Sequence, residues 1–530
     1  MEQQDLNKRL IMAFVLSFLV FVGYSYMFGT QPNQQASQNA QTPQAQTSPQ
    51  TPKVQATQQN ADAQVQQVQP TNSSKILVTL TSNIYKISID ELGRISQYEL
   101  LEDKYKTKDG NDLQIIGANE AKPLEIRFSD TNINNEAFKT PYSYNGEASL
   151  DVSNSSKTIT LTQKLSSVTV TKKITINPNG SYSIDVSTSK PIAYFITPGH
   201  RPMADSSRYM LVRGALVKTK DGVIKTIEDK KAKGDESFSN ARIASAFDRY
   251  VATMFYNFKD GMNVSVLKVE NDNPLLFVQG KPNLHLDGYI GPKEHNILAS
   301  INPELTDAIE FGWFTFLSKP FFHILLAIHN AIGNWGWAII IFTLLVKLVL
   351  FPLSYKGMMS MQKLKDLAPQ MKDLKEKYKD DPAKMNMKMM EMYKKHNVNP
   401  MGGCLPMLLQ IPVFFALYRV LLNADELQGA TWIGGWIDNL AVADPYYILP
   451  ILMGASMWFQ QRITPNNFTD PMQEKIFKWF PVGMALMFII MPFPSGLVLY
   501  WVINNLFTIG QQYVINKAYT KHKEALKIKK

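Results

Sequence analysis

The sequence predicts a polytopic α-helical membrane protein with six spans and an all-β sandwich domain outside the cytoplasm. Apolar runs long enough to cross a bilayer occur at the N-terminus and again after residue 330. Between them, residues 74–302 alternate β-branched and polar residues at period two, which is typical of strands. The formal net charge of +10 is carried by two lysine-rich segments, residues 356–396 and 516–530, and such local basicity predicts cytoplasmic segments.

The first 30 residues are predicted to form a transmembrane anchor. Residues 10–28 are apolar and follow Lys8 and Arg9, which keep the N-terminus in the cytoplasm by the positive-inside rule. The run ends in YSYMFG, whereas a secretory signal peptide would be shorter and would end in a small-residue cleavage site. We therefore expect an uncleaved anchor.

Residues 31–72 are predicted to form a disordered linker. Gln, Asn, Thr, Ser, Pro and Ala dominate this segment, so it cannot bury enough apolar surface to offset the entropy of ordering. Flexible-coil scaling gives it a reach of about 35 Å. The following domain can then stand away from the membrane.

Residues 73–305 are predicted to form the sandwich. The clearest strands are residues 76–80, 157–161 and 168–171. Hairpin turns are predicted at residues 177–180 (NPNG) and 220–222 (KDG). Many strands with short turns favour an antiparallel sandwich over a βαβ sheet. Neither His200 beside Arg201 nor Asp248 beside Arg249 belongs to a catalytic pattern, so we expect a binding, spacing or scaffold role.

Residues 306–530 are predicted to form the helical core. Residues 308–330 are aromatic-rich but are broken by Lys319 and Pro320, so they could be a span or an interfacial helix. Two basic, cytoplasmic termini require an even number of spans, which places this helix on the outer membrane interface. The six spans are predicted near residues 10–28, 335–355, 402–422, 445–462, 477–491 and 495–515.

Lys347 interrupts the second span well away from either end. It lies eight residues before Tyr355, about 12 Å along a helix, which is farther than a lysine side chain reaches. An ion at that depth costs about 2.5 to 3.5 kcal/mol. We therefore predict a functional cation, the alternative being a snorkelling lysine on a tilted helix.

Further polar side chains within the spans predict a hydrated groove around this cation. They are Thr343 on the same face as Lys347, Gln410, Ser456, Gln460, Tyr500, Trp501, Asn504, Asn505 and Thr508. Ordinary interhelical hydrogen bonding is the alternative. Because the spans contain no Asp or Glu, transient binding of acidic groups on a passing polypeptide fits better than ion-coupled transport.

Residues 357–397 are predicted to form a cytoplasmic helical hairpin. Its apolar residues repeat at coiled-coil spacing, and Asp380-Asp381-Pro382 makes the turn. Methionines such as Met371, Met385 and Met389 either line the seam between the two helices or bind a partner. The residues expected to recruit cytoplasmic partners are Lys363, Lys365, Met371, Met385 and Met389 of the hairpin, and Lys527, Lys529 and Lys530 of the basic tail 516–530.

The segments that follow carry specific motifs. They read NPMGGCLP at 399–406, QIP at 410–412, FALY at 415–418, DPYYILP at 444–450, TDPMQ at 469–473 and FPSGL at 493–497. In this order they closely resemble the signatures of the YidC membrane protein insertase family. The resemblance covers the chain from about residue 308 onward.

The resemblance implies a five-span insertase core, preceded by an anchor and by the large periplasmic domain of Gram-negative members, in the bacterial inner membrane. In that family a groove open to cytoplasm and lipid receives nascent membrane segments without nucleotide hydrolysis. Its positive residue matches Lys347, although the familiar residue there is arginine. Trp501 likewise stands where the pattern has a second tyrosine.

We therefore predict a non-enzymatic insertase and membrane chaperone that captures nascent membrane proteins in a positively charged groove and releases them into lipid, alone or with the Sec translocon. The other expected partners are the ribosome, the signal recognition particle pathway and membrane lipid. No cofactor or metal is expected, since one cysteine and seven scattered histidines form no ligand pattern. The alternative is a small-solute transporter with an extracytoplasmic binding domain, which would usually show internal repeats.

Overall fold

The structure is a computed structural model that describes residues 65–66, 75–107, 109–204, 212–234, 236–396, 398, 405–464, 471–491 and 493–528. The chain divides into a strand-rich unit that ends at Gly291 and a helical unit that begins at Pro292. Asp103–Tyr105 belongs to the helical unit, although its neighbours in sequence are strand-rich. The predicted first span lies outside the described residues.

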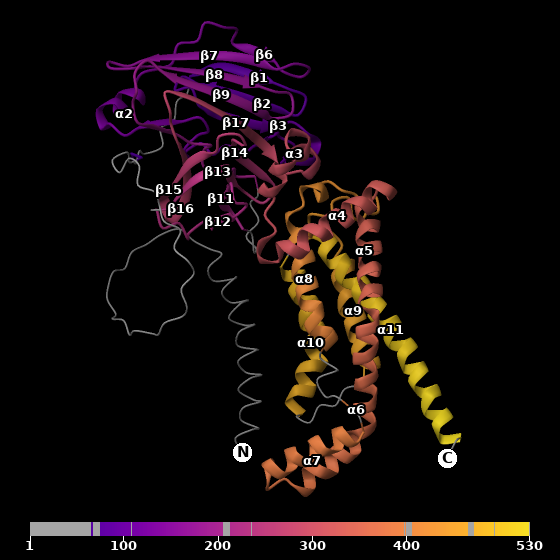
Figure 1. Cartoon of the computed structure of the whole chain (residues 1–530). Helices are drawn as coiled ribbons and strands as arrows, with labels where there is room; N and C mark the ends of the chain where they lie inside the picture. The colour runs from indigo at the N-terminus through magenta and orange to yellow at the C-terminus, as the bar shows by residue number, and fades with distance from the viewer. Residues whose placement is uncertain are drawn as a thin grey trace. The chain divides into compact units, whose positions relative to one another are not determined.

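The strand-rich unit contains two sheets (Figure 1). The smaller has the order β4-β3-β2-β1-β6, with β1 Ile76–Thr81, β2 Tyr85–Asp90, β3 Ile95–Leu100, β4 Leu113–Gln114 and β6 Ser149–Asp151. The larger runs β5-β10-β16-β15-β13-β14-β17-β9-β8-β7, with β11 and β12 branching from β13. Its strands are β5 Ile126–Phe128, β7 Lys157–Lys164, β8 Thr169–Ile176, β9 Ser181–Thr188, β10 Tyr194–Ile196, β11 Gly214–Thr219, β12 Ile224–Glu228, β13 Glu236–Phe247, β14 Val251–Tyr256, β15 Met262–Val269, β16 Asn273–Gln279 and β17 Asn283–Pro292.

The period-two pattern found in the sequence matches these sheets. Along β8, alternate residues from Val170 to Ile176 are buried, and Lys172 is among them. The NPNG turn joins β8 to β9, where Gly180 has a φ of 82°, a conformation that favours glycine. The KDG turn joins β11 to β12 in the same way, with Gly222 at φ 84°. The predicted strands and turns are thus confirmed.

Val65 and Gln66 depart from the predicted linker, because both pack on the strand-rich unit. Val65 packs against a core cluster that includes Phe195 and Phe277. The Gln66 side chain donates to the Ser129 carbonyl at 2.9 Å, and Arg127 Nη1 donates to the Gln66 carbonyl at 3.1 Å. Contacts of this unit therefore begin before residue 73.

The helical unit contains eight main helices among the described residues. They are α4 Thr315–Ile332, α5 Trp335–Val349, α6 Phe351–Lys377, α7 Pro382–Lys395, α8 Leu405–Asn423, α9 Ile448–Ile463, α10 Pro471–Ile490 and α11 Ser495–Ile528. α11 packs against α5, α6, α8 and α9, whereas α4 packs against α5 and α8. α6 and α7 form a hairpin at one end (Figure 1). The short α3 (His295–Ile301) also belongs here, although the sequence placed it in the sandwich.

Three boundaries differ from the sequence-based prediction. α6 joins the end of the second predicted span to the first arm of the hairpin. α10 begins at Pro471 rather than near residue 477. α11 continues through Ile528, so most of the predicted basic tail is helical. Charged residues ended our predicted spans, but a helix persists where backbone hydrogen bonds and packing continue.

A helix that crosses a bilayer needs about 20 predominantly apolar residues. Within the described ranges no single helix meets that requirement, but α5 and α6 meet it as a pair, joined at a bend of 64°. The count of six spans therefore stays a prediction. The bend lies at Leu350 because Pro352, at the start of α6, lacks an N–H for the Leu348 carbonyl and its ring clashes with that carbonyl.

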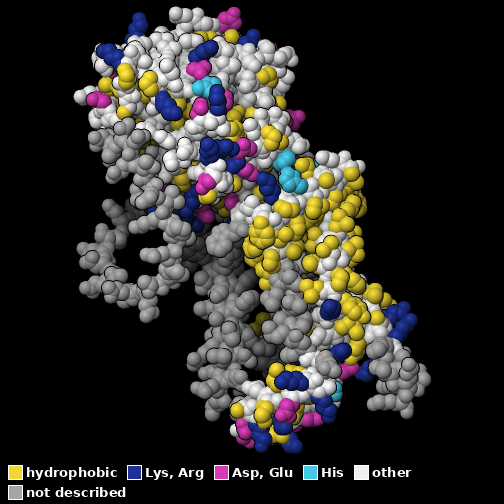
Figure 2. Space-filling model, viewed as in Figure 1, with side chains coloured by type: hydrophobic (Ala, Val, Ile, Leu, Met, Phe, Trp, Pro, Cys, Tyr) yellow, Lys and Arg dark blue, Asp and Glu magenta, His cyan; other side chains and the backbone are white. Residues whose placement is uncertain are grey.

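The helices expose apolar side chains outward. On α5, Trp337, Ile341, Leu345 and Leu348 are exposed and recur every three or four residues, so they form one outer face. Figure 2 shows hydrophobic side chains gathered on the helical unit, while charged side chains gather on the α6–α7 hairpin. A helix in water would instead present a polar outer face.

Gly336 is expected to resist even the smallest substitution. A Cβ added there would overlap the indole ring of Trp432, whose carbonyl accepts a bond from Asn334 Nδ2 at 3.2 Å. Gly336→Ala should therefore destabilise the helical unit by about 1 to 3 kcal/mol, measured by thermal unfolding in detergent. Gly483→Ala is the control, because that exposed helical glycine has open space around it and alanine should stabilise α10 slightly. Equal melting temperatures for the two variants would contradict this expectation.

Candidate functional site

Lys347 lies on the inner face of α5 and is 8% exposed. Its Nζ donates to Thr508 Oγ1 on α11 at 3.0 Å, and that hydroxyl donates in turn to the Asn504 carbonyl at 2.7 Å. Thr508 thereby presents its lone pairs to the ammonium. This partner is neutral, and within the described residues no ion pair joins Lys347 to a carboxylate.

The other predicted groove residues lie on α5, α8, α9 and α11, and most of them are already hydrogen-bonded. Thr343 is buried and donates to the Ile339 carbonyl of its own helix at 2.7 Å. Gln410 Nε2 donates to the Tyr500 hydroxyl at 2.8 Å, which links α8 to α11. Asn505 Nδ2 donates to Ser456 Oγ at 3.2 Å, which links α11 to α9. Gln410 and Asn505 thus make hydrogen bonds between helices, whereas the bond of Thr343 stays within α5.

Trp501 lies among aromatic rings rather than among polar groups. Its ring centroid is 5.0 Å from that of Phe414 on α8 and 5.2 Å from that of Phe488 on α10. The Trp501–Phe488 pair is edge-to-face, which the ring quadrupoles favour. Trp501 therefore joins three helices through apolar contacts.

Two buried polar atoms on α11 have no hydrogen-bond partner among the described residues. They are Asn504 Oδ1, an acceptor, and Gln511 Nε2, a donor. Gln511 was not among the predicted groove residues. Its position seven residues after Asn504, on the same helical face, was the available signal.

Some predicted recruitment residues lie between the two helices of the hairpin, and others lie on its surface. Met371 and Met389 pack against the hairpin core formed by Leu364, Leu367, Met392, Tyr393 and Val398, which supports the seam interpretation for both. Lys363 and Lys365 are exposed, and Met385 is half-buried. Lys527 lies on α11, whereas Lys529 and Lys530 lie outside the described residues.

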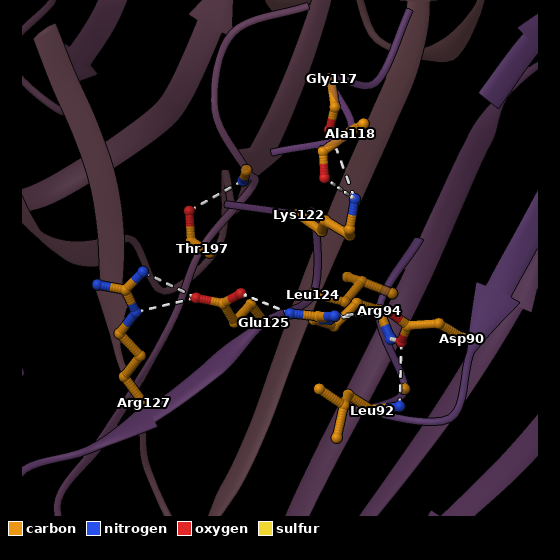
Figure 3. A network of polar contacts seen from close by, with 12 residues as sticks. Asp90, Leu92, Arg94, Gly117, Ala118, Lys122, Leu124, Glu125, Arg127 and Thr197 are labelled. Carbon is orange, nitrogen blue, oxygen red and sulfur yellow. Dashed lines mark hydrogen bonds and ion pairs between the residues drawn. The ribbon is translucent and has the colours of Figure 1, made fainter. Parts of the chain in front are cut away.

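The strand-rich unit contains a buried ion network (Figure 3). Arg94 Nη2 is 2.8 Å from Asp90 Oδ2, and Arg94 Nη1 is 3.1 Å from Glu125 Oε2. Arg127 Nη2 is 2.8 Å from Glu125 Oε1. Lys172 Nζ donates to the carbonyls of Gly93 and Leu124 at 2.9 and 2.7 Å, and burial lowers its pKa to about 7. Ion pairs join Arg94 and Arg127 to the two carboxylates, and Lys172 is held by backbone carbonyls, so these contacts link distant segments of the fold.

The helical unit also buries two adjacent carboxylates just after α8. Asp425 Oδ2 accepts from the Tyr105 hydroxyl at 2.5 Å, and Glu426 Oε1 accepts from the His295 amide at 2.8 Å. Burial raises the pKa of Asp425 to about 6, although Lys104 and the Tyr105 bond oppose the rise. Burial likewise raises the pKa of Glu426 to about 7. The sequence identified this loop only as acidic.

These two carboxylates make the stability of the helical unit depend on pH. Because both folded-state pKa values are raised, their contribution is fully present below about pH 4 and is lost as the pH rises through 6 to 7. We expect the melting temperature to fall between pH 5 and pH 8. Glu426→Gln keeps the acceptor for His295 without the charge, so it should flatten this profile and stabilise the protein at pH 8 by an amount on the order of 2 kcal/mol. Glu391→Gln, at an exposed position on α7, is the control, and an identical fall in all three proteins would contradict the assignment.

Comparison with known proteins covers both units. Residues 77–324 match the family model described as YidC periplasmic domain, and residues 327–523 match the model described as 60Kd inner membrane protein. A relative from Campylobacter jejuni, named membrane protein insertase YidC, is 49% identical over 97% of each chain. A relative of the same name from Wolinella succinogenes is 45% identical and is matched over 99% of this chain and 97% of its own. Another from Helicobacter pylori is 42% identical and is matched over 98% of this chain and 97% of its own. The resemblance read from the motifs is confirmed, and the chain belongs to the YidC family.

Proposed function

We propose that this protein is a membrane protein insertase of the inner membrane, which captures nascent membrane proteins and releases them into the bilayer. Relatives that share its full length carry the name membrane protein insertase YidC. The observation that carries the mechanism is Lys347, a buried cation among apolar helices whose ammonium donates to the neutral hydroxyl of Thr508. A carboxylate on a client can replace that hydroxyl with a gain in attraction, because charge-assisted hydrogen bonds are stronger than neutral ones.

Capture and release are assigned to different faces of α5. The inner face holds Thr343 and Lys347 and draws the polar, often acidic, end of a client into the groove. The outer face, with Trp337, Ile341, Leu345 and Leu348, contacts lipid, and the apolar client segment leaves along surfaces of this kind on the third and fifth spans. No bond is broken in this process, so the protein acts without catalysis and without a cofactor.

The finer topology and the partners are part of the same proposal. Both termini lie in the cytoplasm, six spans cross the membrane, and the strand-rich unit is periplasmic. The exposed Lys363 and Lys365 of the hairpin, with the lysines of the tail, receive the ribosome or the signal recognition particle pathway, since clustered lysines bind RNA phosphates. The protein works alone or beside the Sec translocon and also acts as a chaperone. The transporter alternative is not favoured by relatives named as insertases.

Reconstitution tests the function directly. The full chain in liposomes should insert a small membrane protein with an acidic translocated tail, made by cell-free translation and scored by protease protection of that tail. Empty liposomes and liposomes with heat-denatured protein are the controls. Equal protection with and without the folded protein would contradict the proposal.

A further inference from the structure

One face of α11 combines three polar groups at regular spacing. Asn504, Thr508 and Gln511 are separated by four and three residues, so their side chains lie on the same side of the helix. Thr508 contacts Lys347, whereas Asn504 Oδ1 and Gln511 Nε2 are buried without a partner among the described residues. Gln511 is 6% exposed.

Two neighbouring side-chain amides on the same helix do have hydrogen-bond partners. Asn505 is bonded to Ser456, and Gln512 Nε2 donates to Asn516 Oδ1 at 2.6 Å. A buried polar atom that lacks a partner lowers stability, and an apolar side chain of the same shape would not. An acceptor and a donor left open on either side of Thr508 therefore indicate a partner that arrives from another molecule.

The spacing identifies the chemistry of that partner. The rise of a helix separates Asn504 from Gln511 by about 10.5 Å, which is about three residues of an extended chain. Along this line lie an acceptor at Asn504, an ammonium at Lys347 and a donor at Gln511. A peptide backbone offers the complement, with N–H groups for Asn504 and carbonyl oxygens for Lys347 and Gln511.

We propose that Asn504, Thr508 and Gln511 form a track that binds the backbone of an extended, polar client segment. This inference rests on the proposed insertase function and adds what the groove recognises. A helical client satisfies its own backbone groups, so it gains nothing from the track. An unfolded segment in transit has open N–H and C=O groups that water would otherwise satisfy. Thr508 is a positioning residue, because it orients the Lys347 ammonium while donating to the Asn504 carbonyl.

Insertion should slow without a loss of stability when the track is made apolar. Asn504→Leu and Gln511→Leu should each slow insertion of a client with an uncharged polar tail by about three- to tenfold, with an unchanged or higher melting temperature. Gln512→Leu is the matched control, since it breaks an internal bond and should lower the melting temperature. A lowered melting temperature in the Asn504 and Gln511 variants, or parental insertion rates, would overturn the track.

A chemical change in the client provides an independent test. Replacing three consecutive amides of the polar tail by esters removes N–H donors and weakens the carbonyl acceptors while keeping every side chain. Parent protein should insert this client about threefold to tenfold more slowly than the all-amide client, and the Asn504→Leu, Gln511→Leu double variant should show no such difference. Equal rates for both clients in the parent would overturn backbone recognition. If the parent inserts neither client, the insertase proposal itself fails, which is a distinct result.

Discussion

Lys347→Glu should reduce insertion of a small acidic-tailed membrane protein by at least about tenfold in reconstituted liposomes. The substitution reverses the charge that faces the client, and two charges 4 Å apart interact by about 4 kcal/mol at an effective dielectric constant of 20. Even 1.4 kcal/mol of lost stabilisation gives a tenfold change in rate. Protease protection of the tail over time measures the effect, and Lys347→Ala should fall between the parent and the glutamate variant.

The controls separate charge from damage to the helices. Lys347→Arg keeps the charge and adds a planar fork suited to carboxylates, so it should insert the client at least as fast as the parent. Lys475→Glu changes an exposed lysine on α10 by the same net charge and should have little effect. Parental insertion by Lys347→Glu would refute electrostatic capture and leave the insertase function standing.

Arg94→Met should be the most damaging single change in the strand-rich unit. It leaves Asp90 and Glu125 buried while removing the guanidinium that joins them, and breaking a buried pair costs about 3 to 5 kcal/mol. Glu125 still has its ion pair with Arg127 after this substitution, so the loss of stabilisation is greater for Asp90. Hydrogen–deuterium exchange of peptides covering β2 and β3 in the full chain should show faster exchange.

Lys86→Met provides the matched comparison for this network. The Lys86–Glu99 pair joins β2 to β3 at 3.2 Å, but both side chains are partly exposed to solvent. Its loss should change stability by less than about 1 kcal/mol. If both variants accelerate exchange equally, the buried network does not contribute the stability assigned to it.

The fold was predictable where one local signal decides it. β7 and β8 follow from alternation, and the turn at Gly180 follows from its NPNG sequence. Helix ends were harder, because charged residues suggested stops where α6 and α11 continue. Val65 packs on residues as distant in sequence as Ala121 and Phe277. The amino-acid composition of the linker alone could not predict this contact.

The candidate site was predictable as a set of residue types but not as a set of contacts. Lys347 stood out because a charge in an apolar span is costly. Its contact with Thr508 joins residues 161 positions apart, and the bond from Tyr105 to Asp425 joins residues 320 positions apart. Such pairings depend on tertiary packing, so the sequence alone could not separate Gln410, whose amide is paired, from Asn504, whose Oδ1 has no partner among the described residues.

α11 is one unbroken helix from Ser495 to Ile528, about 50 Å long. Near its far end Lys523 Nζ lies 2.8 Å from Asp366 Oδ2 on α6, and at its middle Thr508 holds Lys347 on α5. Among the contacts along this helix, these two join it to both halves of the bent α5–α6 pair. Because the helix is continuous, we expect a rotation imposed on its lysine-bearing end to be transmitted to the face with Asn504 and Gln511.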